Sequence, residues 1–355
     1  MDYIKIKGYK SIQDLHLDLK PINILIGANG AGKTNFISFF HFLNMAYNQL
    51  LLRGVSKSGG VNKFLHHGRK VTEQLSAKLS FGNGTNHYEF ALEVGDTSFV
   101  VTKEILGYDG RDWDIAEAKP ELQLKNNSLH RANYINSAIN ALKVYHFHET
   151  GAKSAFNEDA RINDNYMLSN HGANLASILY ALQQNNRIVY NRIVQALQSV
   201  APYFLDFELR PNTPDSEYIR LAWKDKYHTE NTYGATDFSD GTIRYLALVT
   251  LFLQANTPPV IIIDEPELGL HPFAISKLAG LIKSVAAKGT QVILATQSVE
   301  LINCFEPEDI ITVDNIDGAS EFERLDSSKL SVWLDDYTIG DMWKQNILDK
   351  GFPNR

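Results

Sequence analysis

A glycine-rich segment at residues 27–34, Gly-Ala-Asn-Gly-Ala-Gly-Lys-Thr, constrains this chain more than any other feature. The apolar residues 21–26 before it are typical of a buried strand, and the mostly apolar residues 35–43 after it are typical of a helix. The glycines free the backbone so that successive N–H groups can turn toward one anion, and the start of the following helix adds its positive end. The pattern G-x-x-x-x-G-K-[ST] in this setting predicts a phosphate-binding loop in an α/β fold, with a flexible turn as the alternative.

The ligand that such a loop predicts is a nucleoside triphosphate with Mg²⁺. Lys33 is expected to reach the β and γ phosphates, and the Thr34 hydroxyl is expected to ligate Mg²⁺. The residues expected to surround the phosphates are Gly27, Asn29, Gly30, Gly32, Lys33, Thr34 and Asn35.

Composition limits the partners and the compartment. The chain has 355 residues, enough for one large or two ordinary domains, and its 44% hydrophobic content is that of a globular protein. A formal charge of −7 argues against general coating of nucleic acid, so any DNA contact must be local. One cysteine, Cys304, and the lack of a secretion signal or a long apolar run favour a cytoplasmic protein with no membrane span.

The predicted elements alternate between strands and helices near both ends of the chain, which favours a mainly parallel sheet covered on both faces. Helices are expected at about 35–52, 174–200, 241–254 and 273–286, and buried strands at 21–26, 260–263, 291–294 and 310–313. Residues 71–103 alternate with period two and predict an antiparallel meander, and residues 107–140 predict loops and short helices. We expect one bilobed domain over 1–355, with an N-terminal lobe at 1–140, a helical and β insertion at 141–232 and a C-terminal lobe at 233–355.

Two acids, Asp264 and Glu265, follow four β-branched residues at 260–263. Such a strand is buried on both faces, so its acids are expected at the carboxyl edge of the sheet, beside the phosphate loop. Asp264 would hold Mg²⁺, and Glu265 would orient and deprotonate the water that attacks the γ-phosphate. Two solvated acids at a strand end are the alternative.

Three further motifs carry a resemblance to a known family. Residues 238–242, Phe-Ser-Asp-Gly-Thr, resemble the ABC-type signature, residues 267–272 resemble the D-loop, and residues 295–298 resemble the switch segment. Together with the opening Lys-Gly-Tyr-Lys-Ser-Ile at 7–12, they make the chain similar to the SMC/RecF-like branch of ABC ATPases. More narrowly, it resembles the stand-alone, OLD-like ATPases without a nuclease domain that occur in bacterial and phage-defence loci.

This resemblance implies an ABC-type bilobed ATPase head with an antiparallel β subdomain and a helical subdomain. In that family two heads associate head to tail on ATP, so Ser239 would act in trans and, with Gly241, would face the partner's nucleotide. Lys10 would lie near the nucleotide, and Gln297 would take the switch position in catalysis. The resemblance also implies a homodimer that controls a separately encoded effector, such as a nuclease, in DNA-linked defence or repair.

Two departures from the family pattern keep other functions open. Asp240 replaces the first signature glycine, and Gln297 stands where many relatives carry histidine, so turnover is expected to be slow. An ATP-gated nucleic-acid clamp with little turnover is the alternative, and a transporter nucleotide-binding subunit is a third possibility. The Q-loop glutamine of the family has no clear counterpart. His148, after the predicted strand 142–147, is a candidate by position, and an ordinary strand-end histidine fits equally well.

A basic stretch at residues 53–70 contains no acid. It predicts a contact with DNA phosphates or an acidic partner, against a solvated loop as the alternative. Its candidate contact residues are Arg53, Lys57, Lys63, Arg69 and Lys70.

Overall fold

The computed structural model describes residues 1–348 apart from 117, 152, 212 and 214–216. The chain divides into two compact units. Unit 1 comprises Met1–Val144, Ile293–Val299 and Glu306–Arg355, and unit 2 comprises Tyr145–Val292 and Glu300–Phe305. The division into three parts at residues 140 and 232 stays a prediction.

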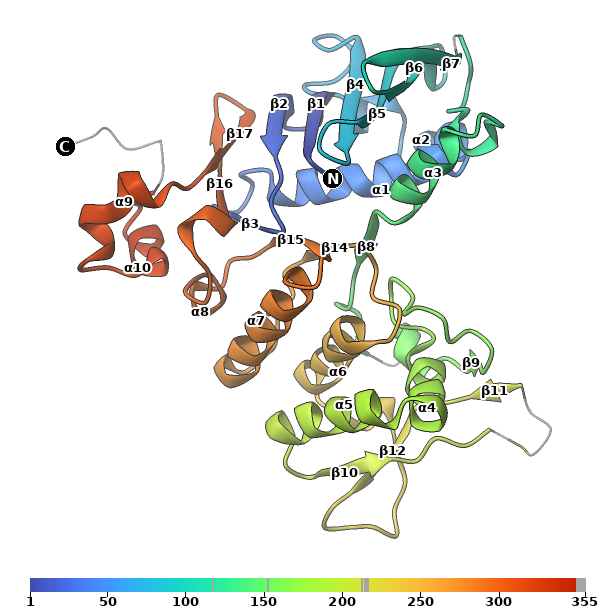
Figure 1. Cartoon of the computed structure of the whole chain (residues 1–355), viewed down its shortest axis with the longest axis vertical. Helices are drawn as coiled ribbons and strands as arrows, with labels where there is room; N and C mark the ends of the chain where they lie inside the picture. The colour runs from blue at the N-terminus through green and yellow to red at the C-terminus, as the bar shows by residue number, and fades with distance from the viewer. Residues whose placement is uncertain (117, 152, 212, 214–216, 349–355) are drawn as a thin grey trace. The chain divides into compact units, whose positions relative to one another are not determined.

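Unit 1 contains a six-stranded sheet in the order β2-β1-β4-β5-β6-β7, in which every neighbouring pair is antiparallel (Figure 1). Its strands are β1 (Tyr3–Tyr9), β2 (Ile12–Asp18), β4 (Gln74–Phe81), β5 (Asn86–Val94), β6 (Phe99–Tyr108) and β7 (Arg111–Ala116). The predicted meander is confirmed. The expectation of only loops and helices after residue 107 was wrong, because the edge strand β7 is largely exposed and its polar residues carry no apolar alternation.

A second six-stranded sheet has the order β17-β16-β3-β15-β14-β8. Its strands are β3 (Ile22–Ile26), β8 (Lys143–Tyr145), β14 (Val260–Asp264), β15 (Gln291–Ala295), β16 (Ile310–Ile316) and β17 (Ala319–Arg324). In unit 1, β3 pairs in parallel with β16, and β16 forms an antiparallel hairpin with β17. The expected α/β fold with a parallel-containing sheet is therefore confirmed, whereas the sequence did not predict β17, whose charged residues mask its alternation.

The predicted helices are also present. Unit 1 holds α1 (Lys33–Tyr47), α2 (Leu51–Lys57), α3 (Ala132–Asn140), α9 (Ser327–Leu334) and α10 (Ile339–Lys344); the short helix α8 spans Val299–Ile302. Unit 2 holds α4 (Leu175–Asn185), α5 (Arg187–Val200), α6 (Asp240–Leu253) and α7 (Pro272–Ala286). Small sheets in unit 2 are formed by β10 (Phe204–Phe207), β12 (Ala222–Asp225) and β13 (Tyr233–Gly234), and by β9 (Ala160–Arg161) and β11 (Tyr218–Ile219). Among the described helices, none combines the length and apolar character needed to cross a bilayer.

Aromatic side chains fix the segments that carry the candidate site. In unit 1, Phe39 of α1 packs edge-on against Tyr9 at the end of β1, with ring centroids 5.4 Å apart. In unit 2, Phe238 stacks on Trp223 of β12, with centroids 4.4 Å apart and ring planes within 12°. Because Phe238 lies next to Ser239, the N-cap residue of α6, this stack holds the start of that helix.

Candidate functional site

The glycine-rich loop connects β3 and α1 within unit 1, as predicted. All five residues of β3 are buried. Gly27 and Gly32 have φ angles of 153° and 120°, and a Cβ at these positions would lie 2.1 Å from the Val313 carbonyl oxygen and 1.9 Å from Ser320 Oγ. Any side chain at either position would clash and strain the backbone, so both glycines are required by the loop's conformation and packing.

Lys33 lies at the start of α1 with 5% of its surface exposed. Its Nζ donates hydrogen bonds to the carbonyl oxygens of Gly27, at 2.7 Å, and Ala28, at 3.0 Å. The ammonium is therefore held by the backbone of the loop that is predicted to bind the phosphates. The next residue, Thr34, is exposed in the same helical turn.

Lys10 lies in the two-residue turn between β1 and β2, with φ at 47°. Its Nζ donates to Ser38 Oγ of α1 at 2.8 Å and lies 5.4 Å from the centre of the Tyr9 ring. Burial lowers the pKa of the Lys10 ammonium below its ordinary value. The turn is thereby tied to the helix that follows the phosphate loop.

The switch segment joins the same unit through its backbone. The Thr296 N–H donates to the carbonyl oxygen of Leu25 in β3 at 3.0 Å, and the following side chain, Gln297, is exposed. Unit 1 thus contains the phosphate loop, Lys10 and Gln297.

The two predicted acids lie in unit 2, where β14 ends. Asp264 and Glu265 are both half-buried, and Glu265 has a φ of 44°, in the left-handed region that non-glycine residues rarely adopt. A small cavity beside them is also lined by His148, the positional candidate for the Q-loop residue, and by Arg244. The structure therefore groups His148 with the acids, although their roles stay predictions.

The signature residues begin α6 in the same unit. Ser239 is the exposed N-cap of the helix, and its Oγ accepts a hydrogen bond from the Thr242 N–H at 3.3 Å. A Cβ on Gly241 would lie 2.2 Å from the carbonyl oxygen of Gly269, so the signature packs directly against the D-loop. This contact explains why glycine is needed at 241 even though Asp240 replaces the preceding one.

Arg244 is a residue that sequence reasoning missed. Its guanidinium donates to three backbone carbonyl oxygens: those of Phe147 at 3.1 Å, His148 at 2.7 Å and Leu268 at 3.1 Å. One side chain therefore connects the signature helix, the D-loop and the segment that carries His148. One feature of the sequence could have identified it, namely a charged arginine near the start of a mostly buried, apolar helix.

Asp240 belongs to the same set of contacts. Its Oδ1 accepts a 2.6 Å hydrogen bond from Thr150 Oγ1, two residues beyond His148. The residue that departs from the family signature thus ties the start of α6 to residues 147–150.

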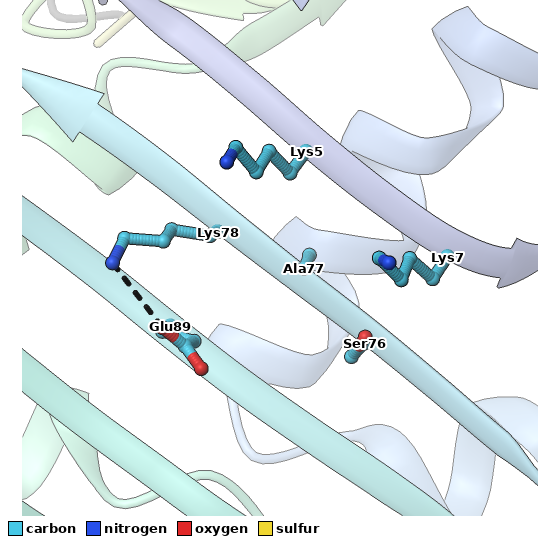
Figure 2. A pocket seen from close by; sticks show the side chains of 6 residues that line it. All are labelled: Lys5, Lys7, Ser76, Ala77, Lys78 and Glu89. Atoms are coloured by element: carbon cyan, nitrogen blue, oxygen red, sulfur yellow. Dashed lines mark ion pairs between the residues drawn. The ribbon is translucent and has the colours of Figure 1, made fainter. Parts of the chain in front are cut away.

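The five predicted basic contact residues are all exposed in unit 1, and none forms an ion pair with another described residue. A separate pocket of about 300 Å³ lies on the antiparallel sheet, where Lys5, Lys7 and Lys78 line it together with Glu89 (Figure 2). Lys5 lies directly across from Lys78, which is 3.4 Å from Glu89. Within the described chain, no cluster of three or more His, Cys, Asp or Glu residues could hold a metal ion.

Comparisons with known proteins identify the family and the fold. Residues 22–303 match the model of the family described as "AAA domain, putative AbiEii toxin, Type IV TA system". A "Putative ABC transporter ATP-binding protein" of Streptomyces coelicolor is 43% identical over 65 residues, which are 18% of this chain and 11% of that protein. A corresponding protein of Streptomyces avermitilis is 38% identical over 65 residues, with the same coverage. The chain thus spans about a tenth of the length of these relatives.

Two solved structures share the fold. An Smc head bound to the C-terminal winged-helix domain of ScpA superposes with a TM-score of 0.60 at 15% identity, covering 92% of this chain and 98% of that one. An Smc head with an extended coiled coil, bound to the C-terminal domain of ScpA from Pyrococcus furiosus, gives 0.56 at 15% identity, covering 94% and 98%. At these identities the likeness shows the fold alone, that of an SMC-type head.

Proposed function

We propose, from the premise that this chain belongs to the family described as "AAA domain, putative AbiEii toxin, Type IV TA system", that it binds Mg-ATP, closes into a head-to-tail homodimer and hydrolyses the ATP to reopen. The family and the SMC-type head fold make the chain an ABC/SMC-like ATPase. Catalysis, dimerisation and the roles of single residues are the proposal.

The observation that carries it is the formed phosphate loop with its buried lysine. Lys33 keeps its ammonium on the loop carbonyls of Gly27 and Ala28. Phosphate oxygens would bind the same cation and would accept hydrogen bonds from the loop N–H groups at the start of α1. The loop and its buried cation therefore support binding of an anion at this position.

Hydrolysis would use the acids of unit 2. Glu265 is proposed to orient and deprotonate the attacking water, with Gln297 hydrogen-bonding to the γ-phosphate or that water. The hydroxyl of Thr34 and the carboxylate of Asp264 are hard oxygen ligands of the kind that Mg²⁺ prefers, so they are proposed to hold it. When bound, Mg²⁺ would neutralise charge on the β and γ phosphates.

Dimerisation would bring Ser239 and Gly241 of one copy to the nucleotide of the other. The exposure of Ser239 at a helix N-terminus supports this, because its hydroxyl and the first N–H groups of α6 can reach an anion outside their own chain. A nucleotide that contacts both copies favours the closed state by its extra affinity for that state.

The closed dimer is proposed to control a separately encoded effector in DNA-linked defence or repair. The solved Smc heads are bound to ScpA domains, so this fold can carry a partner protein. The cytoplasmic location stays a prediction, and a role as a transporter subunit has only the short match to the Streptomyces proteins in its favour.

Replacing Lys33 with alanine tests the nucleotide site. Loss of a charge-assisted contact predicts ATP binding that is weaker by about 10- to 100-fold, with the fold retained. Lys288→Ala is the control, because Lys288 is exposed in unit 2 and has no proposed role. Equal ATP affinity in wild type, Lys33→Ala and Lys288→Ala would refute the assignment of the loop.

A second candidate function, an ATP-gated nucleic-acid clamp, is favoured by the basic surface of unit 1. The five exposed residues of the 53–70 stretch lack carboxylate partners among the described residues. Like charges directly across a strand pair destabilise a sheet, yet Lys5 and Lys78 face each other. Phosphate oxygens would supply counter-ions to these cations and would add to Glu89, which already pairs with Lys78 at 3.4 Å.

Charge reversal of Arg69 and Lys70 to Glu tests that clamp. Loss of two phosphate contacts predicts weaker DNA binding and a slope of log affinity against log salt that is smaller by about 1.8. The same reversal at Lys277 and Lys288, exposed in unit 2, serves as the control. An unchanged slope in the Arg69 and Lys70 variant would show that these residues do not contact DNA and instead face solvent or a protein partner.

A further inference from the structure

The β16–β17 hairpin brings Ser320 next to the phosphate loop within unit 1. Ser320 is 6% exposed, and its Oγ lies 2.6 Å from the carbonyl oxygen of Ala31, the loop residue before Gly32. It also lies 2.7 Å from Ser11 Oγ, and the Ser320 N–H donates to the Ser11 carbonyl oxygen at 2.7 Å. Asn35 Nδ2, one residue beyond Thr34, donates to Ser11 Oγ at 2.8 Å.

The donors of these bonds are the Ser320 hydroxyl and the Asn35 amide. A carbonyl has no proton, so Ser320 Oγ is the donor to Ala31, and it is also the donor toward Ser11 Oγ, so its one proton is shared between two acceptors. Ser11 Oγ accepts from the Asn35 amide as well. The result is one connected chain of contacts, Asn35 to Ser11 to Ser320 to Ala31.

We propose that Ser320 is a positioning residue that holds the phosphate loop in its anion-binding shape. The chain of hydrogen bonds starts in the first turn of α1 and ends on the loop backbone, so it fixes both sides of Gly32. It passes through Ser11, the neighbour of Lys10 in the β1–β2 turn. Ser320 therefore links three segments that are far apart in sequence: the turn at 10–11, the loop at 27–34 and β17.

Glycine is needed at 32 for the same reason. Because a Cβ there would lie 1.9 Å from Ser320 Oγ, the loop can approach Ser320 closely enough for the Ala31 bond only without a side chain at 32. The effect of this positioning on ATP rests on the proposed nucleotide function, whereas its effect on the loop does not.

Ser320→Ala tests the proposal with two measurements. Amide hydrogen exchange of the nucleotide-free protein should rise by about 3- to 10-fold at residues 27–34 and stay unchanged in the meander β4–β6, as expected from the loss of one net hydrogen bond. ATP affinity should fall by about the same factor. Ser80→Ala is the control, because Ser80 is a buried serine of β4 in the same unit and is hydrogen-bonded to Asp2.

The double variant Ser11→Ala, Ser320→Ala separates positioning from general damage. A single chain of bonds predicts that the double variant exchanges no faster at 27–34 than Ser320→Ala alone, whereas independent effects would add. Faster loop exchange in a protein that binds no ATP would support the positioning role and refute the nucleotide function. Unchanged loop exchange in Ser320→Ala would overturn the positioning role, whatever the ATP affinity.

Discussion

The two units hold their parts of the candidate site by different means. In unit 1, the Lys33 ammonium is held by two carbonyl oxygens of its own loop, and the loop glycines pack against Val313 and Ser320. In unit 2, the signature, the D-loop and the segment of His148 are joined by one side chain, Arg244, through three carbonyl oxygens. The cation of unit 1 is thus held by the loop to which it belongs, whereas the cation of unit 2 connects segments that are far apart in sequence.

This difference separates the effects of substitutions. Changes in unit 1 should weaken ATP binding by the single chain, because they alter the phosphate loop. Changes in unit 2, apart from those at the proposed Mg²⁺ ligand Asp264, should leave that binding in place and reduce turnover or dimer formation. Arg244→Ala tests this separation most directly, because ATP affinity and hydrolysis are measured together.

Asp264→Asn should have the largest effect. Loss of a negative charge at the proposed Mg²⁺ ligand should weaken Mg²⁺ binding by at least about 100-fold, more than the loss of an outer-shell partner, and reduce hydrolysis in proportion. Titration of Mg²⁺ at fixed ATP, with hydrolysis as the signal, measures the shift. A variant with the wild-type Mg²⁺ midpoint would remove Asp264 from the metal site.

Arg244→Ala should reduce hydrolysis by about 10- to 100-fold, because three carbonyl oxygens lose a charged donor and the segments they belong to lose their link. ATP affinity of the single chain should stay within about twofold of wild type. Arg244→Lys is the informative partner variant, since one ammonium cannot reproduce the fork geometry of a guanidinium and should restore only part of the rate. A fall in ATP affinity equal to the fall in the hydrolysis rate would contradict the prediction that substitutions in the two units have different effects.

Thr150→Val should have the smallest effect, about two- to threefold on hydrolysis, because its bond to Asp240 is exposed. Thr150→Ser keeps the hydroxyl and should match wild type. Wild-type hydrolysis in Thr150→Val with a reduction only in Thr150→Ser would show that the methyl group matters and that the Asp240 bond does not.

Sequence motifs identified the parts of the site that depend on local backbone. The spacing of glycines, Lys33 and Thr34 is dictated by one turn between a strand and a helix, so eight residues are enough to predict it. Ser239 is the N-cap of α6 in the structure, a role that serine favours for the same local reason.

The residues that sequence reasoning missed act over long sequence separations. Ser320 reaches a loop at residues 27–34 through a charged edge strand, and Arg244 reaches carbonyl oxygens at 147, 148 and 268. Backbone carbonyls have no side-chain signature, so no residue pattern marks the partner of either donor. The strand β7 was missed for a related reason, since an exposed edge lacks the apolar alternation that identifies a strand.

The central claim is that ATP closes two copies of this chain and that Glu265 reopens them through hydrolysis. Glu265→Gln keeps the size of the side chain but removes the base, so light scattering with Mg-ATP should show a stable dimer and without nucleotide a monomer. Adding Ser239→Arg, which places a bulky cation on the exposed signature, should abolish that dimer. If Glu265→Gln is no more dimeric with Mg-ATP than without it, the head-to-tail sandwich or the assignment of Glu265 as the base is wrong.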